Sequence, residues 1–442
     1  MTIRMDEGAA ELLDTLHRAG YAAYVVGGCV RDSLLGLTPH DWDLCTSALP
    51  QQGMELFGEE KCIPTGLQHG TVTVKQGGGL YEITTFRTEG TYTDGRHPDE
   101  VHFVPDVRED LARRDFTINA MAYNEKEGLV DPFGGQADLQ SGIVRAVGVP
   151  RQRFTEDALR ILRLYRFAAR FGFAIAPPTA QAAQELCAHL DCVSVERIEE
   201  ELAKLLSAPA PAAYLNEKIL SVVLPELSPE ALAAAKPVVD ACPAGERALP
   251  VRLAALLLSL GEDGTRRTLR RLRCSNACIE ETAVLVREVV SGVPGAFSSD
   301  TNRAIPSPAL LPAATGSHPS GRSSEKLPAR PPVSLNIYTR KLLGQYGLKT
   351  VQRLAALGTA LQPEHAADFA ALSELAEQLD ADGVCCRVSQ LAVNGRDLMA
   401  AGVPAGPGIR KVLEALLDGV IREEYPNERK ALLAAVRQLA AS

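Results

Sequence analysis

The sequence lacks the features of a membrane protein and of a zinc-binding protein. Its longest apolar run, LAALLLSL at residues 253–260, is too short to span a bilayer, and Arg252 precedes it. Its ten cysteines include no CxxC pair, and the one-turn spacing of Cys274 and Cys278 has no second ligand pair to complete a zinc site. The N-terminus has no apolar run ahead of a small-residue cleavage site, so we expect no signal peptide. These absences predict a cytoplasmic protein with reduced thiols and no membrane partner.

A general excess of positive charge is also missing. The 442 residues carry 46 Lys and Arg against 55 Asp and Glu, which gives a formal net charge of −9. This balance excludes a wholly basic nucleic-acid binder but leaves room for a local basic face. Hydrophobic residues make up 46% of the chain, which is ordinary for a folded protein. The length requires more than one hydrophobic core.

The residue pattern changes twice along the chain. Residues 1–145 mix helical stretches with the strand-like segments YAAYVVGG, WDLCT, GTVTVKQ and LYEITTFR, and the pattern is then nearly all helical. Residues 293–333 crowd Pro, Ser, Gly and Ala without periodicity, which predicts a mobile linker. We therefore predict an α+β fold, with a mixed α/β head containing a short β-sheet followed by all-α segments. The predicted domains are the head at 1–145, a helical neck at 146–207, a helical body at 208–292, the linker at 293–333 and a helical tail at 334–442.

Two carboxylates lie close together in the segment HDWDLCT. If this segment is a strand, alternation places Asp41 and Asp43 on one face and turns Trp42 into the core. Two carboxylates on one edge repel each other and need a counter-charge, and Mg²⁺ accepts a few carboxylates together with phosphate oxygens. Two such ions can activate an attacking hydroxyl and stabilise a leaving oxygen. Glu82, in LYEITTFR, is a candidate third ligand if its strand lies beside this one.

A glycine pair precedes the carboxylates in the segment GGCVRD. Gly27 and Gly28 let the backbone approach a phosphate, and Arg31 can add a charge-assisted hydrogen bond to the same anion. Asp32 can either brace Arg31 or cap a helix that begins at SLLG. The G-x-G-x-x-G pattern of a dinucleotide-binding fold is absent. A phosphate cradle and metal carboxylates within one unit indicate phosphoryl transfer.

Two arginine-rich segments follow. In RFTEDALRILRLYRFAARFGF we expect Thr155 to cap a helix, with Asp157 in its first turn and Arg160 on the same face. Arginines recur along this helix at 160, 163, 166 and 170, which argues for a phosphate-facing surface inside an acidic protein. The other segment, LARRDFTINAMAY, concentrates arginine where a helix should start. Downstream, RRTLRRLRCSN at 266–276 is either an RNA-backbone contact or a solvated helix face.

These motifs together resemble the polymerase β nucleotidyltransferase superfamily. More narrowly, GGCVRD…DWD, LARRDFTINAMAY and EDALR resemble the class II tRNA nucleotidyltransferases, or CCA-adding enzymes, and the related bacterial poly(A) polymerases. The resemblance implies template-independent addition of CCA to the 3′ end of tRNA from CTP and ATP, with Mg²⁺ as the cofactor. It implies that the metals are held by Asp41 and Asp43, with Glu82 as a possible third ligand. It implies that the triphosphate is contacted by Gly28, Arg31, Arg114, Arg163 and Arg166. It also implies that Asp115 and Asn119 contact the ribose and that Asp157 and Arg160 read the base.

An aspartate and an arginine suit the reading of cytosine and adenine. Aspartate only accepts hydrogen bonds and arginine only donates them. Cytosine and adenine both present an amino donor beside a ring-nitrogen acceptor, whereas guanine and uracil present the reverse order. Because each unmet buried hydrogen bond costs about 1–3 kcal/mol, one Asp157–Arg160 pair can favour CTP and ATP over GTP and UTP.

Several members of the family fit the same catalytic residues. The resemblance implies that a Gly- and charge-rich loop, here at 92–99, is needed to add the final adenosine and is shortened in enzymes that add only CC. The loop has its full length in this sequence, which favours complete CCA addition over addition of CC alone. An enzyme that adds only the final A remains open. A poly(A) polymerase also remains open, although this acidic chain lacks the basic extension of those enzymes. A non-catalytic RNA-binding protein is the alternative from another class. In every case tRNA or another RNA is the expected partner, not DNA. In SVERIEEELAKLL we expect Glu196 and Arg197 to form a bracing ion pair.

Overall fold

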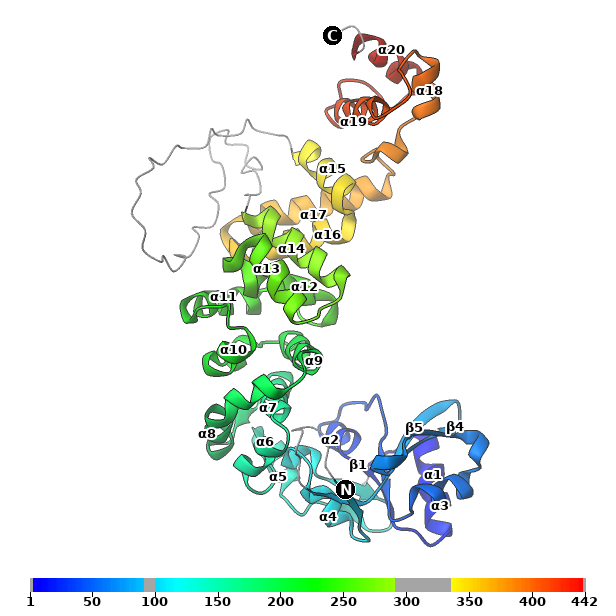
Figure 1. Ribbon diagram of the computed structural model, residues 1–442, viewed down its shortest axis with the longest axis vertical. Coiled ribbons are helices and arrows are strands. Elements are labelled where there is room, and N and C mark those ends of the chain that lie inside the picture. The colour runs from blue at the N-terminus through cyan, green and yellow to red at the C-terminus, as the bar shows by residue number, and fades with distance from the viewer. Residues whose placement is uncertain (1–2, 91–99, 291–334, 440–442) are drawn as a thin grey trace. The chain divides into compact units, whose positions relative to one another are not determined.

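The structure, a computed structural model, describes residues 3–90, 100–290 and 335–439. The predicted loop at 92–99 and the predicted linker at 293–333 lie outside the described residues. The chain divides into two compact units, Met1–Pro225 and Glu226–Ser442 (Figure 1). Within the described ranges, none of the helices combines the length and the apolarity needed to cross a bilayer. The finer division into head, neck, body and tail stays a prediction.

The first unit is built around a seven-stranded sheet with the strand order β3-β4-β5-β2-β1-β8-β9. The pairs are antiparallel except for β2 and β5, which run parallel with Leu44 beside Ile83. A two-stranded ribbon of β6 and β7 and a small parallel pair of β10 and β11 complete the strands described in this unit. The strands are β1 Ala23–Val26, β2 Leu44–Thr46, β3 Cys62–Gly66, β4 Thr71–Gln76, β5 Gly79–Thr85, β6 Arg87–Glu89, β7 Val101–Phe103, β8 Ala122–Asn124, β9 Gly128–Val130, β10 Ile143–Val144 and β11 Ala174–Ile175.

Helices cover this sheet and then continue without strands. The longer ones are α1 Glu7–Arg18, α3 Pro50–Phe57, α7 Leu159–Phe171, α8 Pro177–Leu186 and α9 Val195–Leu206; the short ones are α2 Gly28–Leu34, α4 Val107–Ala112, α5 Gly135–Ser141, α6 Pro150–Glu156 and α10 Glu217–Val223. Asp6 caps α1, because its Oδ2 accepts a hydrogen bond from the Gly8 amide at 3.1 Å. The predicted α+β class is confirmed.

The core of the head lies between the central strands and α4. Tyr24 and Val26 of β1 pack with Phe86 and with Leu111 of α4, and all four side chains are buried. Burying an aromatic ring such as that of Phe86 contributes about 2–3 kcal/mol relative to leaving it exposed. This packing fixes the end of β1, and therefore the turn that follows it, against the segment after α4.

The second unit contains only helices in its described part. They are α11 Pro229–Ala241, α12 Leu249–Leu257, α13 Gly261–Arg271, α14 Asn276–Val290, α15 Leu335–Tyr346, α16 Leu348–Leu361, α17 Ala366–Ala381, α18 Gly395–Ala400, α19 Gly408–Ile421 and α20 Arg429–Leu439. Leu398, Leu416 and Leu432 join the last three helices in one apolar cluster. The close approach of α16 and α17 requires Gly358, where a Cβ would lie 2.2 Å from Phe369 Cε1. These short-range contacts explain why the periodicity of the sequence predicted the helices well.

The arginines predicted as an RNA contact or a solvated face divide into two groups. Arg266 binds Glu262 at 2.9 Å and Glu280 at 2.5 Å, and Arg271 binds Glu226 at 2.7 Å. Arg267 and Arg270 are exposed on the same helix, α13. Part of the charge is therefore balanced within the protein, and the RNA contact stays a prediction.

Candidate active site

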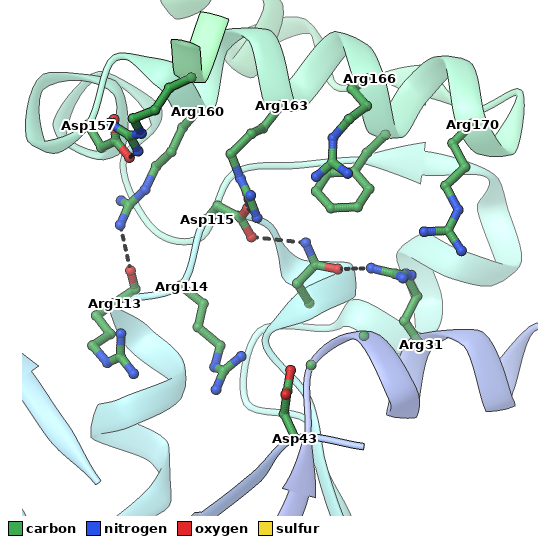
Figure 2. Close-up of a pocket in the computed structure, with 15 residues that line it drawn as sticks. Arg31, Asp43, Arg113, Arg114, Asp115, Asp157, Arg160, Arg163, Arg166 and Arg170 are labelled. Atoms are coloured by element: carbon green, nitrogen blue, oxygen red, sulfur yellow. Dashed lines mark hydrogen bonds and ion pairs between the residues drawn. The ribbon is translucent and has the colours of Figure 1, made fainter. Parts of the chain in front are cut away.

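One cavity of the first unit gathers most of the predicted site residues. Its volume is about 450 Å³. Arginines on α7 reach down toward Asp43 and Arg114 from the opposite wall, as Figure 2 shows. Eight arginines and three aspartates line the cavity, so it is strongly basic. The lining residues are Gly27, Gly28, Arg31, Asp43, Arg113, Arg114, Asp115, Asn119, Asp157, Arg160, Arg163, Arg166, Phe167, Arg170 and Arg197.

The two carboxylates of HDWDLCT lie just before a strand and not within one. β2 begins at Leu44, and both Asp41 and Asp43 are exposed. The prediction of a strand through Asp41 is wrong, and Trp42 is only half-buried instead of lying in the core. The reason lies in β1: its last ladder bond joins the Val26 amide to the Asp43 carbonyl at 2.9 Å, and the chain then turns away at Gly27.

The strand order brings Glu82 to the carboxylate pair. β2 and β5 run parallel, and Leu44 of β2 lies beside Ile83 of β5. Asp43 directly precedes Leu44 and Glu82 directly precedes Ile83, so these two carboxylates occupy neighbouring positions. Glu82 is exposed, and its charge acts on Asp43. The adjacency that the sequence left open is therefore present, although Asp41 and Glu82 are not among the residues that line the cavity.

The charges around Asp43 suit a divalent cation. Desolvation by the surrounding protein raises the pKa of Asp43, Arg114 lowers it, and Glu82 and Asp41 raise it again. Among the described ion pairs, none neutralises these three carboxylates. No group of three His, Cys, Asp or Glu side chains in the described residues stands close enough to hold a metal together. Two carboxylates completed by phosphate and water oxygens are the arrangement that Mg²⁺ favours.

Gly27 makes the turn between β1 and α2, and α2 begins at Gly28 instead of at the predicted SLLG. Gly27 has φ 78°, and a Cβ there would lie 2.8 Å from Arg114 Nη1. Only glycine therefore allows both the backbone conformation and the approach of Arg114. The Nε atom of Arg114 is buried without a hydrogen-bond partner, and its Nη2 lies 3.5 Å from Asp110. Arg114 thus keeps donors available beside Asp43.

Arg31 is held by its neighbours on every side. Its Nε lies 2.8 Å from Asp32 Oδ1, and its Nη1 donates to Asn119 Oδ1 at 2.5 Å. Its guanidinium lies over the rings of Phe167 and Phe171, 5.2 and 5.0 Å from their centroids. Of the two roles considered for Asp32, bracing Arg31 is the one observed. Arg31 is a fixed positive charge in the wall of the cavity.

Asp115 links the segment after α4 to α7. Its Oδ2 accepts hydrogen bonds from Arg163 Nε and Nη2 at 2.9 and 2.7 Å, and its Oδ1 accepts one from Asn119 Nδ2 at 3.0 Å. Burial raises the pKa of Asp115, but Arg163, the Asn119 amide and Arg160 outweigh this and bring the pKa to about 2. The Asn119 amide uses both of its polar atoms, because its nitrogen donates to Asp115 and its oxygen accepts a hydrogen bond from Arg31. Arg31, Asn119, Asp115 and Arg163 therefore form one continuous network.

Asp157 and Arg160, the pair predicted to read the base, lie at a break between two helices. α6 ends at Glu156 and α7 begins at Leu159, so Asp157 has an extended backbone with φ −144° and ψ 104°. The prediction that Thr155 caps the helix is wrong, because Asp157 Oδ1 accepts from the Leu159 amide at 3.0 Å. Arg160 binds Glu156 Oε2 at 2.7 Å and the Arg113 carbonyl at 3.1 Å. Both residues line the cavity.

Arg197 is a cavity residue whose partner the sequence analysis missed. Its Nη2 donates to Asp157 Oδ2 at 2.8 Å, and the expected bracing pair with Glu196 stays a prediction. Arg197 lies in the first turn of α9, far along the chain from Asp157. A helical-wheel pattern does not show which residue of another helix an arginine meets, so the sequence carried no signal for this pair.

Two arginines of α7, Arg163 and Arg166, are anchored from α9. Arg166 Nε lies 2.6 Å from Glu201 Oε2, and Arg163 Nη1 lies 3.7 Å from Glu201 Oε1. The guanidinium of Arg166 also covers the Phe167 ring at 4.1 Å from its centroid. Burial raises the pKa of Glu201, while Arg166 and Arg163 lower it. One buried carboxylate thus orients two cations toward the cavity.

Models of known protein families match three parts of the chain. A model described as the poly A polymerase head domain matches residues 23–145. One described as a probable RNA and SrmB-binding site of polymerase A matches residues 172–230, and a putative tRNA nucleotidyltransferase domain 2 matches residues 336–436.

The chain is similar over nearly its whole length to curated and solved proteins. It is 35% identical to the CCA-adding enzyme of Lactiplantibacillus plantarum, over 99% of this chain and 97% of the relative. It is 35% identical to the CCA-adding enzyme of Geobacillus thermodenitrificans, over 96% of this chain and 95% of the relative. The solved CCA-adding enzyme of Bacillus stearothermophilus in complex with CTP has a TM-score of 0.78 at 30% identity, over 99% of this chain and 98% of that chain.

Proposed function

The chain belongs to the family of CCA-adding tRNA nucleotidyltransferases, and we propose that it builds or repairs the 3′-terminal CCA of tRNA from CTP and ATP without a nucleic-acid template. One observation carries this proposal: a single basic cavity contains Asp43, the arginines suited to a triphosphate, and the Asp157–Arg160 pair suited to a base. The relatives named above are CCA-adding enzymes, and one of them was solved with CTP. We place the reaction in the cytoplasm, with tRNA as the partner.

The proposed reaction transfers a nucleotide to a hydroxyl group. The terminal hydroxyl of tRNA attacks the α-phosphorus of CTP, twice, and then that of ATP; a phosphodiester bond forms, the bond to the β-phosphate breaks, and pyrophosphate and a proton leave. Asp41 and Asp43, with Glu82 beside them, would hold Mg²⁺, which when bound lowers the pKa of the attacking hydroxyl and neutralises developing charge. The unpaired carboxylates around Asp43 support this placement.

The cavity arginines bind and orient the triphosphate. Arg114 has free donors beside Asp43 and is suited to the phosphate that reacts. Arg31, Arg163 and Arg166 are held in place by carboxylates, so they bring positive charge to the substrate with little loss of side-chain entropy on binding. Asp115 accepts hydrogen bonds from Arg163 and from Asn119. We propose that Asp115 and Asn119 contact the ribose while they keep these hydrogen bonds.

Asp157 and Arg160 select the base. The carboxylate of Asp157 accepts from the exocyclic amino group of cytosine or adenine, and Arg160 donates to the ring nitrogen beside it. Arg197 binds the Asp157 carboxylate and Glu156 binds the Arg160 guanidinium, so each of the two side chains has a partner of its own. Guanine and uracil would leave both groups without a match, which costs about 1–3 kcal/mol for each unmet bond.

The test is incorporation into tRNA that lacks CCA, with CTP and ATP supplied separately and together. An enzyme that adds the whole CCA sequence needs both CTP and ATP to restore a tRNA that accepts an amino acid. Long A tails from ATP alone would instead identify a poly(A) polymerase. Addition of A only to tRNA that already ends in CC would identify an A-adding enzyme, and a product that stops at CC would identify a CC-adding enzyme. No incorporation with any tRNA would leave an RNA-binding protein without catalysis.

A further inference from the structure

The last arginine of α7, Arg170, has no role in the proposed function so far. It lines the cavity at the end opposite to Asp157 and Arg160, as Figure 2 shows. Arg160 and Arg170 are ten residues apart on one helix, which corresponds to about 15 Å of rise. An extended nucleoside triphosphate spans a comparable length. If its base lies at Arg160 and its α-phosphate near Asp43, its terminal phosphate points toward Arg170.

Arg170 is also the least committed of the four arginines on α7. Arg160, Arg163 and Arg166 are anchored by the contacts described above. Arg170 has one hydrogen bond, from Nη2 to Asp32 Oδ2 at 3.1 Å, and its side chain is 42% exposed. Its guanidinium stacks over Phe171 at 4.9 Å from the ring centroid. It therefore retains donors that an incoming anion can use.

Asp32 connects Arg170 to the phosphate-binding turn. Its Oδ1 holds Arg31 Nε at 2.8 Å, while its Oδ2 holds Arg170, so one buried carboxylate serves two arginines. Burial lowers the pKa of Arg31, Asp32 raises it, and the nearby charge of Arg170 lowers it again. Two cations facing each other over one shared carboxylate leave an excess positive charge that favours a further anion.

We propose that Arg170 binds the terminal phosphate of the nucleoside triphosphate, and then the leaving pyrophosphate, by exchanging Asp32 for a phosphate oxygen. This inference rests on the proposed function for the identity of the nucleotide. Asp32 keeps Arg170 at the end of the cavity in the free protein and retains Arg31 through its other oxygen when Arg170 moves. Arg170 thereby makes the protein bind a nucleoside triphosphate more tightly than the corresponding diphosphate.

The experiment compares binding of CMP, CDP and CTP to the full-length protein by calorimetry, with Mg²⁺ and without tRNA. Arg170→Gln should bind CMP as the wild type does and lose the gain in affinity between CDP and CTP. We expect this loss to be about tenfold to hundredfold, the size of a charge-assisted hydrogen bond. Arg170→Lys should keep part of the gain, because it retains the charge without the planar fork.

A matched control is Arg151→Gln on α6, an exposed residue that pairs with Glu185 outside the cavity. It should leave the affinities for all three nucleotides unchanged. The KM for pyrophosphate in the reverse reaction should rise in Arg170→Gln and not in Arg151→Gln. The assignment is overturned if Arg170→Gln keeps the gain from CDP to CTP, or if it weakens CMP as much as CTP. Because no tRNA is present in the binding series, failure of CCA addition would refute the proposed function without touching this result.

Discussion

Arg197 Nη2 lies 2.8 Å from Asp157 Oδ2, so the carboxylate proposed to read the base is held by an arginine from another helix. The other oxygen, Asp157 Oδ1, accepts hydrogen bonds from the Leu159 amide at 3.0 Å and from Arg197 Nη1 at 3.3 Å. Together these bonds orient the carboxylate before any nucleotide arrives. The proposed base selection would therefore depend on α9 as well as on the junction of α6 and α7.

Loss of the Asp157 carboxylate should relax base selection. We expect Asp157→Ala to reduce the preference for CTP and ATP over GTP and UTP by about tenfold to hundredfold, the value of one buried hydrogen bond. The measurement is kcat/KM for each of the four nucleotides with tRNA lacking CCA. Selectivity equal to that of the wild type would contradict the assignment of Asp157.

Loss of Arg197 should also relax base selection, but less than loss of Asp157 does, because Asp157 keeps its hydrogen bond to the Leu159 amide. The matched control is Lys204→Ala on the same helix, where Lys204 pairs with Glu200 at the surface. Arg197→Ala should lower selectivity by about tenfold, whereas Lys204→Ala should leave it unchanged. Equal effects of the two variants would show that α9 acts only through its general stability.

Removal of the Asp43 carboxylate, which we propose binds the metal, should stop the chemistry without abolishing nucleotide binding. We expect Asp43→Asn to slow the incorporation of CMP by about a thousandfold or more, since bound metal supplies several kcal/mol to such a transition state. Rapid-quench measurement of incorporation, together with the CTP dissociation constant, separates the two steps. A rate within about tenfold of the wild type would refute the metal assignment, and the same assay on Glu82→Gln shows whether Glu82 belongs to the site.

Gly27 should matter for Arg114 as well as for its own turn. Gly27→Ala places a methyl group 2.8 Å from Arg114 Nη1, while Gly36→Ala meets no atom within 4 Å, although φ is 78° at Gly27 and 74° at Gly36. Both variants should lose about 1–2 kcal/mol of stability from the left-handed conformation. Only Gly27→Ala should also weaken CTP binding, because it displaces Arg114. Calorimetry of both variants tests this, and equal CTP affinities would contradict it.

Asp115 should make the head sensitive to acid. Its pKa is lowered to about 2 in the folded protein, compared with about 3.9 in an unfolded chain. The carboxylate therefore stabilises the fold fully above about pH 4, and this contribution disappears as the pH falls toward about 2. Asp115→Asn should cost about 2 kcal/mol near neutral pH, and its difference from the wild type should shrink below about pH 4.

Urea titrations of both proteins across this range measure the difference. A gap that stays constant with pH would show that the ionised form of Asp115 does not stabilise the fold. An independent check is the carboxyl resonance of Asp115 in Arg163→Gln. Without that guanidinium, burial should shift the pKa upward.

The sequence predicted which residues meet in the cavity better than it predicted the backbone that brings them there. Ten of the predicted site residues line it: Gly28, Arg31, Asp43, Arg114, Asp115, Asn119, Asp157, Arg160, Arg163 and Arg166. Their motifs are local, and the helical spacing of the α7 arginines fixes a common face. The roles assigned to these residues stay predictions until the variants above are measured.

The errors occur where a particular hydrogen bond, near or distant in the sequence, decides the local conformation. The strand through Asp41 fails because β1 ends at Val26 and leaves Asp41 without a ladder partner. The cap at Thr155 fails because Asp157 competes for the same helix start with its own side chain. The Arg197–Asp157 and Arg170–Asp32 pairs join segments far apart in the chain, and side-chain pairing across such distances in sequence leaves no periodic pattern.

The parallel pairing of β2 with β5 has a consequence for comparing distant relatives. The lateral position of Glu82 beside Asp43 is set by a hydrogen-bonded ladder and not by the length of chain between them. α3, β3 and β4 occupy that intervening stretch, and insertions there would leave Asp43 and Glu82 in neighbouring positions. A search that fixes the number of residues between the aspartates and the glutamate would therefore miss proteins with the same arrangement of charges.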